Sequence, residues 1–279
     1  MATTRVFQAG ATTGYDHTAV LTLALDTTTK GGSVALVRGE TVLAVIQGDD
    51  TRTHGERLPG EIDRALAAAR VAPGDLELIA VATGPGAFTG LRIGLAAVQG
   101  LAIVTATPVV GVSALDALGR AAFEMSSTDG PVSAWMDAAR GEVFAACYGR
   151  DQRGSPTPVP TDCPLVAKPA IILSTLAAMD VSTTTFIGDG AVRYRVEIAR
   201  GGGGDVCVLE PPPALAPIIA LIGQQLAGRG QAGPPHGLQP LYVRRPDAEL
   251  ERARGRDSAA GSAVSWTPSR PAVPRADSE

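Results

Sequence analysis

The sequence predicts an α/β protein of two lobes, and three observations support this prediction. Apolar segments of strand length alternate with segments of helical periodicity from residue 20 to residue 226. Three strand-like segments follow one another before the first helix, and a second, weaker series of the same kind begins at Pro131. Each series opens with a strand that ends in an aspartate, Asp26 in the first and Asp137 in the second. A chain of 279 residues can bury two such layered units, so we expect two lobes with a cleft between them.

The first series begins with three meandering strands. VLTLALDT (20–27) predicts a buried strand, while GSVALVRG (32–39) and ETVLAVIQ (40–47) predict a hairpin that turns at Gly39-Glu40. Three meandering strands before the first crossover are characteristic of the ribonuclease H-like layout. The other segments of this series are strands over 76–83 and 108–112 and helices over 58–69, 91–101 and 113–124.

The start of the first helix has two candidate positions. Thr53-His54-Gly55-Glu56 fits a capping box, T-x-x-E, which predicts a start at residue 54. Pro59 lacks a backbone N–H and restricts Leu58, which favours a start near Pro59 instead.

The second series is less regular, and both ends of the chain lack periodicity. Its strands are expected over 131–138, 141–149, 183–190 and 205–210, and its helices over 169–179, up to Arg200, and over 215–226. The tail is rich in Pro, Ser, Ala and mixed charge, so it buries too little apolar surface to offset its ordering entropy. A partner-binding peptide around Trp266 is the alternative for the tail. We therefore expect a flexible segment 1–19, lobes 20–125 and 126–245, and a flexible tail 246–279.

Composition excludes several classes of protein. The formal net charge of −4 does not favour a nucleic-acid or anionic-membrane binder. Three cysteines without a C-x-x-C pair argue against a disulfide framework and a cysteine zinc site. The apolar runs look too short to cross a bilayer, and the first residues lack the apolar segment of a signal peptide. A cytoplasmic protein is expected.

The stretch TGPGAFTGLRIG (83–94) lies between a predicted strand and a predicted helix, where a phosphate cradle could form. It has no lysine, and its glycines follow G-x-G-x-x-x-G, which matches neither the P-loop nor the dinucleotide pattern. The alternative is a tight turn into a closely packed helix. Gly94 and Gly100 favour this alternative, because glycine inside a helix costs about 1 kcal/mol relative to alanine.

The three histidines, His17, His54 and His236, include no pair at the i, i+4 spacing of a helical metal site. No Ser/His/Asp or Cys/His set is evident either. We therefore expect no metal, no cofactor and no catalytic residue, and we interpret His54 as a helix-start or surface residue.

GPGAFTGLRIGLAAVQGLA (84–102) resembles the signature of the TsaB (YeaZ) family, which is close to G-P-G-S-F-T-G-x-R-x-G, with Ala87 in place of serine. ALDTTTKGGSVAL (24–36), HGERL (54–58), MDAARGEVF (136–144) and LYVRR (241–245) agree in order. Pro59 directly follows Leu58, whereas the family commonly has H-x-x-x-L-x-P. The motif turn comprises Gly84, Pro85, Gly86, Phe88, Thr89, Gly90 and Arg92.

The resemblance implies the two-lobed acetate kinase, sugar kinase, Hsp70 and actin (ASKHA) fold. It also implies a non-catalytic subunit that pairs with its paralogue TsaD in making N6-threonylcarbamoyladenosine (t6A) in tRNA, with the ATPase TsaE as third subunit. TsaD carries metal-binding histidines after its glycine helix; Ala114 and Leu118 stand there in this chain. tRNA is then reached only through the complex, and isolated chains could pair as homodimers. By resemblance, a helix interface with TsaD would involve Leu58, Ile62, Leu66, Leu91, Gly94, Val98 and Leu101.

Asp26 and Asp137 stand where kinases of this superfamily hold magnesium and nucleotide. Residues Ala-Ala-Arg-Gly-Glu follow Asp137, where a nucleotide binder has small residues that grip phosphate. The two acids are therefore interpreted as vestiges of a nucleotide site, or as carboxylates that cap their own turns. An ATP-dependent small-molecule kinase and a peptidase acting on its paralogue stay open as alternative functions.

Overall fold

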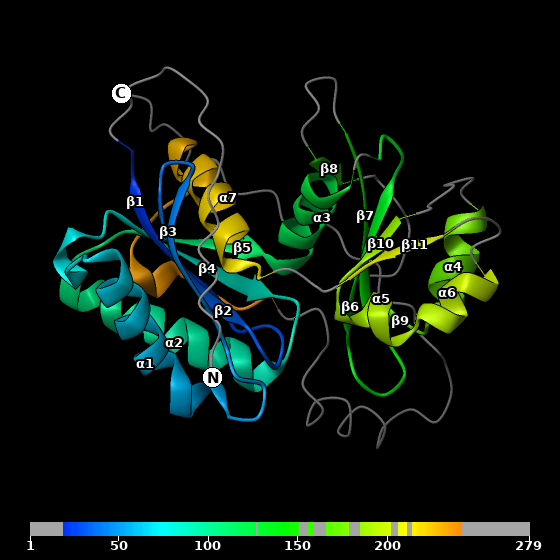
Figure 1. Cartoon of the computed structure of the whole chain (residues 1–279), viewed down its shortest axis with the longest axis horizontal. Helices are drawn as coiled ribbons and strands as arrows, with labels where there is room; N and C mark the ends of the chain where they lie inside the picture. The colour runs from blue at the N-terminus through cyan, green and yellow to red at the C-terminus, as the bar shows by residue number, and fades with distance from the viewer. Residues whose placement is uncertain are drawn as a thin grey trace, which may run out of the picture.

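The computed structural model describes residues 19–126, 128–150, 156–158, 166–178, 185–201, 206–210 and 214–241 (Figure 1). Residues 1–18, the whole tail 246–279 with Trp266, and all but the first residue of LYVRR lie outside these ranges. The described residues form two α/β lobes, each built on one mixed sheet, so the predicted two-lobed architecture is confirmed.

The first sheet has the strand order β3-β2-β1-β4-β5. β1, β2 and β3 are antiparallel neighbours, while β4 and β5 run parallel to β1. Gly39, in the turn between β2 and β3, has a φ of 56°, a left-handed conformation that glycine adopts without strain, and the predicted hairpin is confirmed. The strands are β1 (Leu21–Asp26), β2 (Ser33–Arg38), β3 (Thr41–Gln47), β4 (Leu78–Gly84) and β5 (Val109–Ser113).

Helices α1 (His54–Ala69) and α2 (Phe88–Thr105) cover one face of this sheet. α1 begins at the capping box: the Thr53 N–H donates to the Glu56 carboxylate over 2.8 Å. The expected alternative start at Pro59 is wrong, because Pro59 is accommodated inside the helix on its exposed side. Leu23 and Leu25 of β1 point toward these two helices and form a core with them.

The opposite face of the first sheet packs against α3 (Ala114–Met125) and α7 (Ala216–Gly228). Ala24 and Ala80 point to this face, and Gly223 of α7 lies so close to Ala80 that a Cβ there would clash with it. α7 belongs in sequence to the expected second lobe, 126–245, yet it returns to the first sheet. The expected domain boundaries stay a prediction.

The second sheet has the order β11-β10-β6-β7-β8, with β9 paired to β7. Helices α4, α5 and α6 lie on one face and α3 on the other, so α3 is shared by both lobes. The single helix expected up to Arg200 is two short helices that meet at Tyr194. The elements are β6 (Val132–Asp137), β7 (Val143–Arg150), β8 (Pro156–Pro158), β9 (Val166–Ala167), α4 (Pro169–Ala178), β10 (Thr185–Ile187), α5 (Asp189–Arg193), α6 (Arg195–Gly201) and β11 (Cys207–Leu209).

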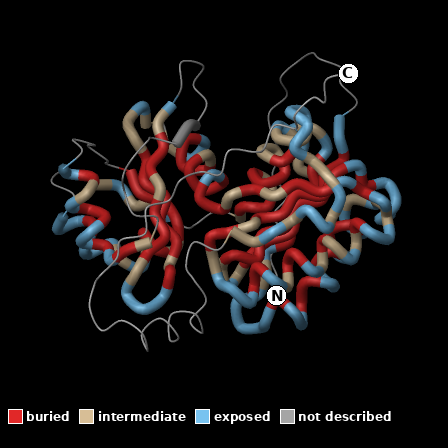
Figure 2. Tube along the Cα trace, turned by 180° about the vertical axis from the view of Figure 1, so that it is seen from behind, coloured by how far each residue is buried: buried red, intermediate tan, exposed pale blue. Residues whose placement is uncertain are grey.

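Burial follows this layering (Figure 2). The strands of both sheets are largely buried, while the outer sides of α1 and α2 are exposed. Beside α2, a segment through the 3-10 helix η2 (Pro235–Gly237) is tied down by the Gln99 side chain, which donates to the Pro235 carbonyl over 3.1 Å. α2 is therefore flanked by α1 and by this segment.

Candidate functional site

The glycine motif packs against the turn that follows β1. A Cβ on Gly86 would overlap Thr28, and one on Gly90 or Gly94 would overlap the carbonyl or the hydroxyl of Thr27. Because these glycines have no side chain, the first turns of α2 can pack directly against Thr27 and Thr28 at the end of β1. This close contact favours the tight turn over the phosphate cradle, because the space beside the motif is filled by the chain itself.

The other residues of the motif divide between the interior and the surface. Gly84 and Pro85 are buried at the end of β4 and are joined by a cis peptide bond. Phe88, Thr89 and Arg92 are exposed on the first turns of α2, where the Arg92 guanidinium stacks 3.9 Å from the centre of the Phe88 ring.

The Asp26 carboxylate caps the turn that follows β1. Its carboxylate accepts hydrogen bonds from the Thr28 N–H (2.9 Å) and the Thr28 hydroxyl (2.6 Å). Burial raises the pKa of Asp26, although these two hydrogen bonds act in the opposite direction. Asp26 is thus engaged with its own backbone, as the turn-capping interpretation requires.

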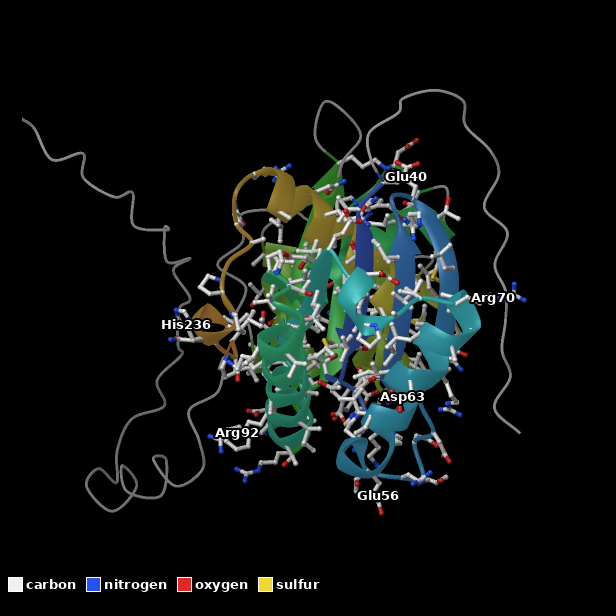
Figure 3. All side chains as sticks on the ribbon, turned by 90° about the vertical axis from the view of Figure 1, so that its left-hand side faces the viewer. Glu40, Glu56, Asp63, Arg70, Arg92 and His236 are labelled. Carbon is white, nitrogen blue, oxygen red and sulfur yellow. The ribbon has the colours of Figure 1, made fainter. Side chains whose placement is uncertain are left out.

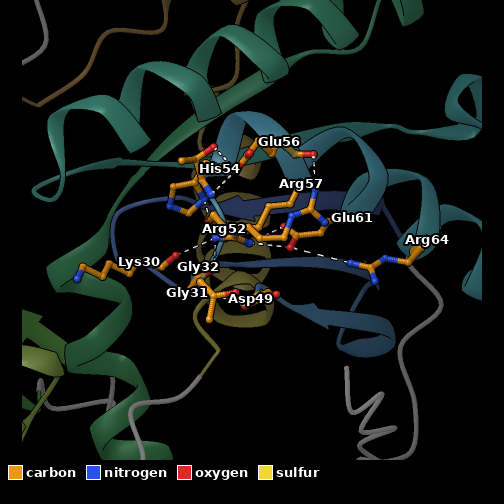
Figure 4. A network of polar contacts seen from close by, with 12 residues as sticks. Lys30, Gly31, Gly32, Asp49, Arg52, His54, Glu56, Arg57, Glu61 and Arg64 are labelled. Atoms are coloured by element: carbon orange, nitrogen blue, oxygen red, sulfur yellow. Dashed lines mark hydrogen bonds and ion pairs between the residues drawn. The ribbon is translucent and has the colours of Figure 1, made fainter. Parts of the chain in front are cut away.

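Arg57, on the first turns of α1, is the centre of a buried polar network (Figure 4). Its guanidinium pairs with both oxygens of Glu61 at 2.6 and 2.9 Å. It also donates to the carbonyls of Lys30 (2.8 Å), Gly31 and Arg52 (3.3 Å). One side chain thereby joins α1 to the β1–β2 turn and to the loop that precedes α1.

His54 belongs to this network, and its protonation state follows from its partners. Its Nε2 lies 2.8 Å from the Thr29 carbonyl, so Nε2–H is the donor, and Nδ1 accepts from Arg57 at 2.9 Å. Burial lowers the pKa of His54, and the Arg57 charge adds to the effect. His54 is therefore a buried neutral imidazole. The helix-start interpretation of His54 is confirmed, since it is the first residue of α1. The surface alternative is wrong, because Gly32 and Gly90, distant in sequence, leave space for the ring.

In the second lobe, Asp137 occupies the corresponding strand end. Its carboxylate accepts from the Ala139 N–H (3.1 Å) and pairs with Arg193 at 2.6 Å. Asp189 accepts from the Asp137 N–H at 3.1 Å. Burial raises the pKa of Asp189, and the charges of Asp137 and Asp26 contribute in the same direction. Asp137 is nevertheless held by its own turn and by an arginine.

The seven residues expected to contact a partner lie mostly in the core of this chain. Six are buried on the sheet side of α1 and α2, and Leu101 is half-buried. A partner cannot touch the six buried residues directly, so any docking through these helices requires their other side. The periodicity that identified the two helices is the periodicity of their core contacts. The residues concerned are Leu58, Ile62, Leu66, Leu91, Gly94, Val98 and Leu101.

The outer sides of α1 and α2 form the surface seen in Figure 3. On α2, the exposed residues after Arg92 are all small or apolar, and Ile103 and Val104 are 71% and 85% exposed. The two helices adjoin, because a Cβ on Gly55 would lie 3.8 Å from Ile93. We call this surface the outer face. Its uncharged residues include Pro59, Gly60 and Ala67 of α1 and Ala96, Gly100, Ile103 and Val104 of α2, and α1 adds the exposed charged residues Glu56, Asp63 and Arg64.

α2 is also the one helix among the described residues that is long and apolar enough to cross a membrane. The expectation that no apolar run reaches this length is wrong. Leu95, Val98 and Ala102 nonetheless pack on the first sheet, so α2 is a core helix with one unusually apolar exposed side. Within the described ranges no cluster of three metal-ligating side chains occurs, and His236 is exposed on η2.

Comparison with known proteins agrees with this geometry. The family model described as TsaD, tRNA N6-adenosine threonylcarbamoyltransferase, matches residues 46–155. The TsaB protein of Bacillus subtilis, named for tRNA threonylcarbamoyladenosine biosynthesis, is 30% identical over 234 residues, which is 82% of this chain and 96% of that protein. TsaB of Haemophilus influenzae is 41% identical over 131 residues, which is 47% of this chain and 54% of that protein.

Among solved structures, YeaZ from Pseudomonas aeruginosa superposes with a TM-score of 0.65 at 30% identity, over 80% of this chain and 99% of that chain. The ribonuclease H-like, ASKHA-type fold that the resemblance implied is thereby confirmed. With a relative of 30% identity matched over nearly its whole length, this chain belongs to the TsaB (YeaZ) family of tRNA threonylcarbamoyladenosine biosynthesis proteins.

Proposed function

We propose that this chain is a non-catalytic cytoplasmic subunit that docks a TsaD paralogue through the outer face and so activates threonylcarbamoyl transfer to tRNA adenosine. TsaE joins as the third subunit, and tRNA is reached through the complex. The observation behind the proposal is the outer face itself, whose exposed residues on α2 after Arg92 are uncharged. Exposed apolar patches often mark protein–protein interfaces, and the exposed Ile103 and Val104 are neighbours on α2.

We choose TsaD as the partner because its family model matches this chain. The TsaD family model matches residues 46–155 of this chain, a range that contains both α1 and α2. A TsaD protein therefore offers a related pair of helices, and two such pairs can pack face to face across a pseudo-two-fold axis. Gly60 and Gly100 have open space beside them in the isolated chain, which leaves room for the approach of a second helix.

The non-catalytic part of the proposal follows from the state of the two acids. Asp26 is buried and bonded within its own turn, and Asp137 is bonded to its own turn and to Arg193. A competent nucleotide site needs several groups that converge on an open space. Both carboxylates are bonded instead to groups of this same chain, which is the arrangement of a structural turn.

The test is titration of the purified chain with the TsaD protein of the same cell, followed by size-exclusion chromatography. The parent chain is expected to form a stable heterodimer that recruits TsaE. Ile103→Glu places a charge in the outer face and is expected to weaken binding about tenfold or more, because interface centres dominate affinity. Ile171→Glu, at a half-exposed position on α4, is the matched control and should bind normally. Normal binding by Ile103→Glu would exclude the outer face as the docking surface.

A further inference from the structure

We infer that Arg57 is a positioning residue that couples the β1–β2 turn, which follows the carboxyl end of β1, to the outer face. The inference rests on the proposed function, since it concerns how the proposed docking surface is held and regulated. Arg57 itself lies on the core side of α1 and cannot touch a docked partner.

The coupling follows from where the guanidinium bonds are made. Three separate segments converge on this group: the turn carbonyls of Lys30 and Gly31, the loop carbonyl of Arg52, and Glu61 one turn further along α1 (Figure 4). Glu61 is buried and receives two of the bonds. A buried ion pair is weak evidence for stability, but losing one partner leaves a buried charge unpaired. We therefore expect the β1–β2 turn, the loop before α1 and the start of α1 to become ordered or disordered together.

The surroundings are shaped for this one side chain. A Cβ on Gly48, at the end of β3, would overlap the Arg57 guanidinium and the Gly31 carbonyl. The Gly48 N–H in turn donates to the Gly32 carbonyl at 3.3 Å, and the Gly32 N–H donates to the Thr29 hydroxyl at 3.2 Å. Amide exchange at Gly32 and Gly48 therefore measures the order of the turn, and neither residue belongs to the outer face.

The same turn also fixes α2. Thr28 lies against Gly86, just before α2, and Thr27 lies against Gly94 within α2, so the turn also contacts the N-terminal half of this helix. By linkage, if an ordered turn strengthens docking by some factor, docking strengthens the order of the turn by the same factor. The turn that follows β1 is thereby connected to the docking surface.

The experiment compares the parent chain with Arg57→Lys, which keeps the charge but loses the branched set of donors. Binding to the TsaD protein is titrated at a temperature where both chains are folded, and amide exchange is followed at Gly32 and Gly48. In the parent chain, docking is expected to slow exchange at both glycines. Arg57→Lys is expected to bind about fivefold or more weakly and to lose this slowing. Ile187→Val, in the core of the second lobe, is the control: it lowers the melting temperature but should keep the parent's affinity.

Gly48→Ala provides a second variant, because a Cβ there overlaps both the Arg57 guanidinium and the Gly31 carbonyl of the turn. It too is expected to bind more weakly and to lose the slowing of exchange. The inference is overturned if Arg57→Lys binds the TsaD protein with the parent's affinity, or if neither variant folds. In either case Arg57 is an ordinary core residue. If the parent chain does not bind the TsaD protein, the proposed function fails, and exchange in the isolated chain still decides the coupling. Arg57→Lys should then speed exchange in the turn and in the start of α1 together; faster exchange in one segment alone would contradict it.

Discussion

Gly94 of α2 lies directly against the side chain of Thr27 at the end of β1, so that a Cβ at residue 94 would overlap the Thr27 hydroxyl. That hydroxyl is fully buried and has no hydrogen-bond partner among the described residues. The glycine is therefore required by packing within the chain. This contact explains why a residue that weakens a helix is present in the middle of α2.

Gly94→Ala is expected to destabilise the isolated chain by about 1–3 kcal/mol, the usual cost of inserting a methyl group into a packed core. Denaturant unfolding of parent and variant measures the difference. Thr27→Ala removes the overlapping hydroxyl, so the double variant should be less destabilised than the sum of the two single changes. Additive effects would show that the two residues do not press on each other.

Gly60→Ala and Gly100→Ala are expected to act in the opposite direction on stability. Both residues are inside exposed helix and have open space where a Cβ would be added. Each substitution should therefore stabilise the isolated chain by about 1 kcal/mol. Each should also weaken docking of the TsaD protein, since a methyl group would hold the partner helix away.

Gly228→Ala is the matched control for these two variants. Gly228 is an exposed glycine at the end of α7 with equally open space, and it lies on the opposite side of the first sheet. It should leave docking unchanged in the same titration. Stabilised Gly60→Ala and Gly100→Ala chains that dock as tightly as the parent would argue against close helix packing at the outer face.

His54 is expected to make the stability of the chain depend on pH. Its folded-state pKa is lowered by burial, so folding favours the neutral ring. The contribution is complete above the unfolded pKa of about 6.5 and is lost as the pH falls from there toward the folded pKa. The difference in unfolding free energy between the parent and His54→Gln, measured from pH 8 downward, should therefore shrink below about pH 6.5. A difference that is constant with pH would mean that His54 does not titrate differently on folding.

Local patterns in the sequence predicted much of this fold correctly. Alternation and turn residues located the hairpin at Gly39, and T-x-x-E marked His54 as one of two candidate starts of α1, the one that the structure confirms. These features depend on neighbouring residues and are therefore readable from sequence. The return of α7 to the first sheet was not predicted, because no local pattern shows it, and the expected second lobe therefore included this helix.

The candidate site was less predictable, because it depends on which side of a helix faces the sheet. Leu58 and Val98 were selected by spacing, and that spacing is equally consistent with a core and with an interface. The burial of His54 was not predicted, because the two glycines that enclose its ring, Gly32 and Gly90, come from other segments. The sequence of α2 does carry one feature that could have indicated its exposed side. The small residues Ala96 and Gly100 alternate with larger apolar residues, and in the structure they are exposed between buried positions.

The central claim is that this chain acts by docking and takes no chemical part in the transfer. Its most direct test is reconstituted threonylcarbamoylation of tRNA with the TsaD protein, TsaE and an enzyme that supplies threonylcarbamoyl-AMP. Transfer is expected to require this chain, to persist with Asp137→Asn at close to the parent rate, and to fall about tenfold or more with Ile103→Glu when the subunits are limiting. Loss of transfer with Asp137→Asn in a heterodimer that still forms, together with full activity of Ile103→Glu, would contradict the account.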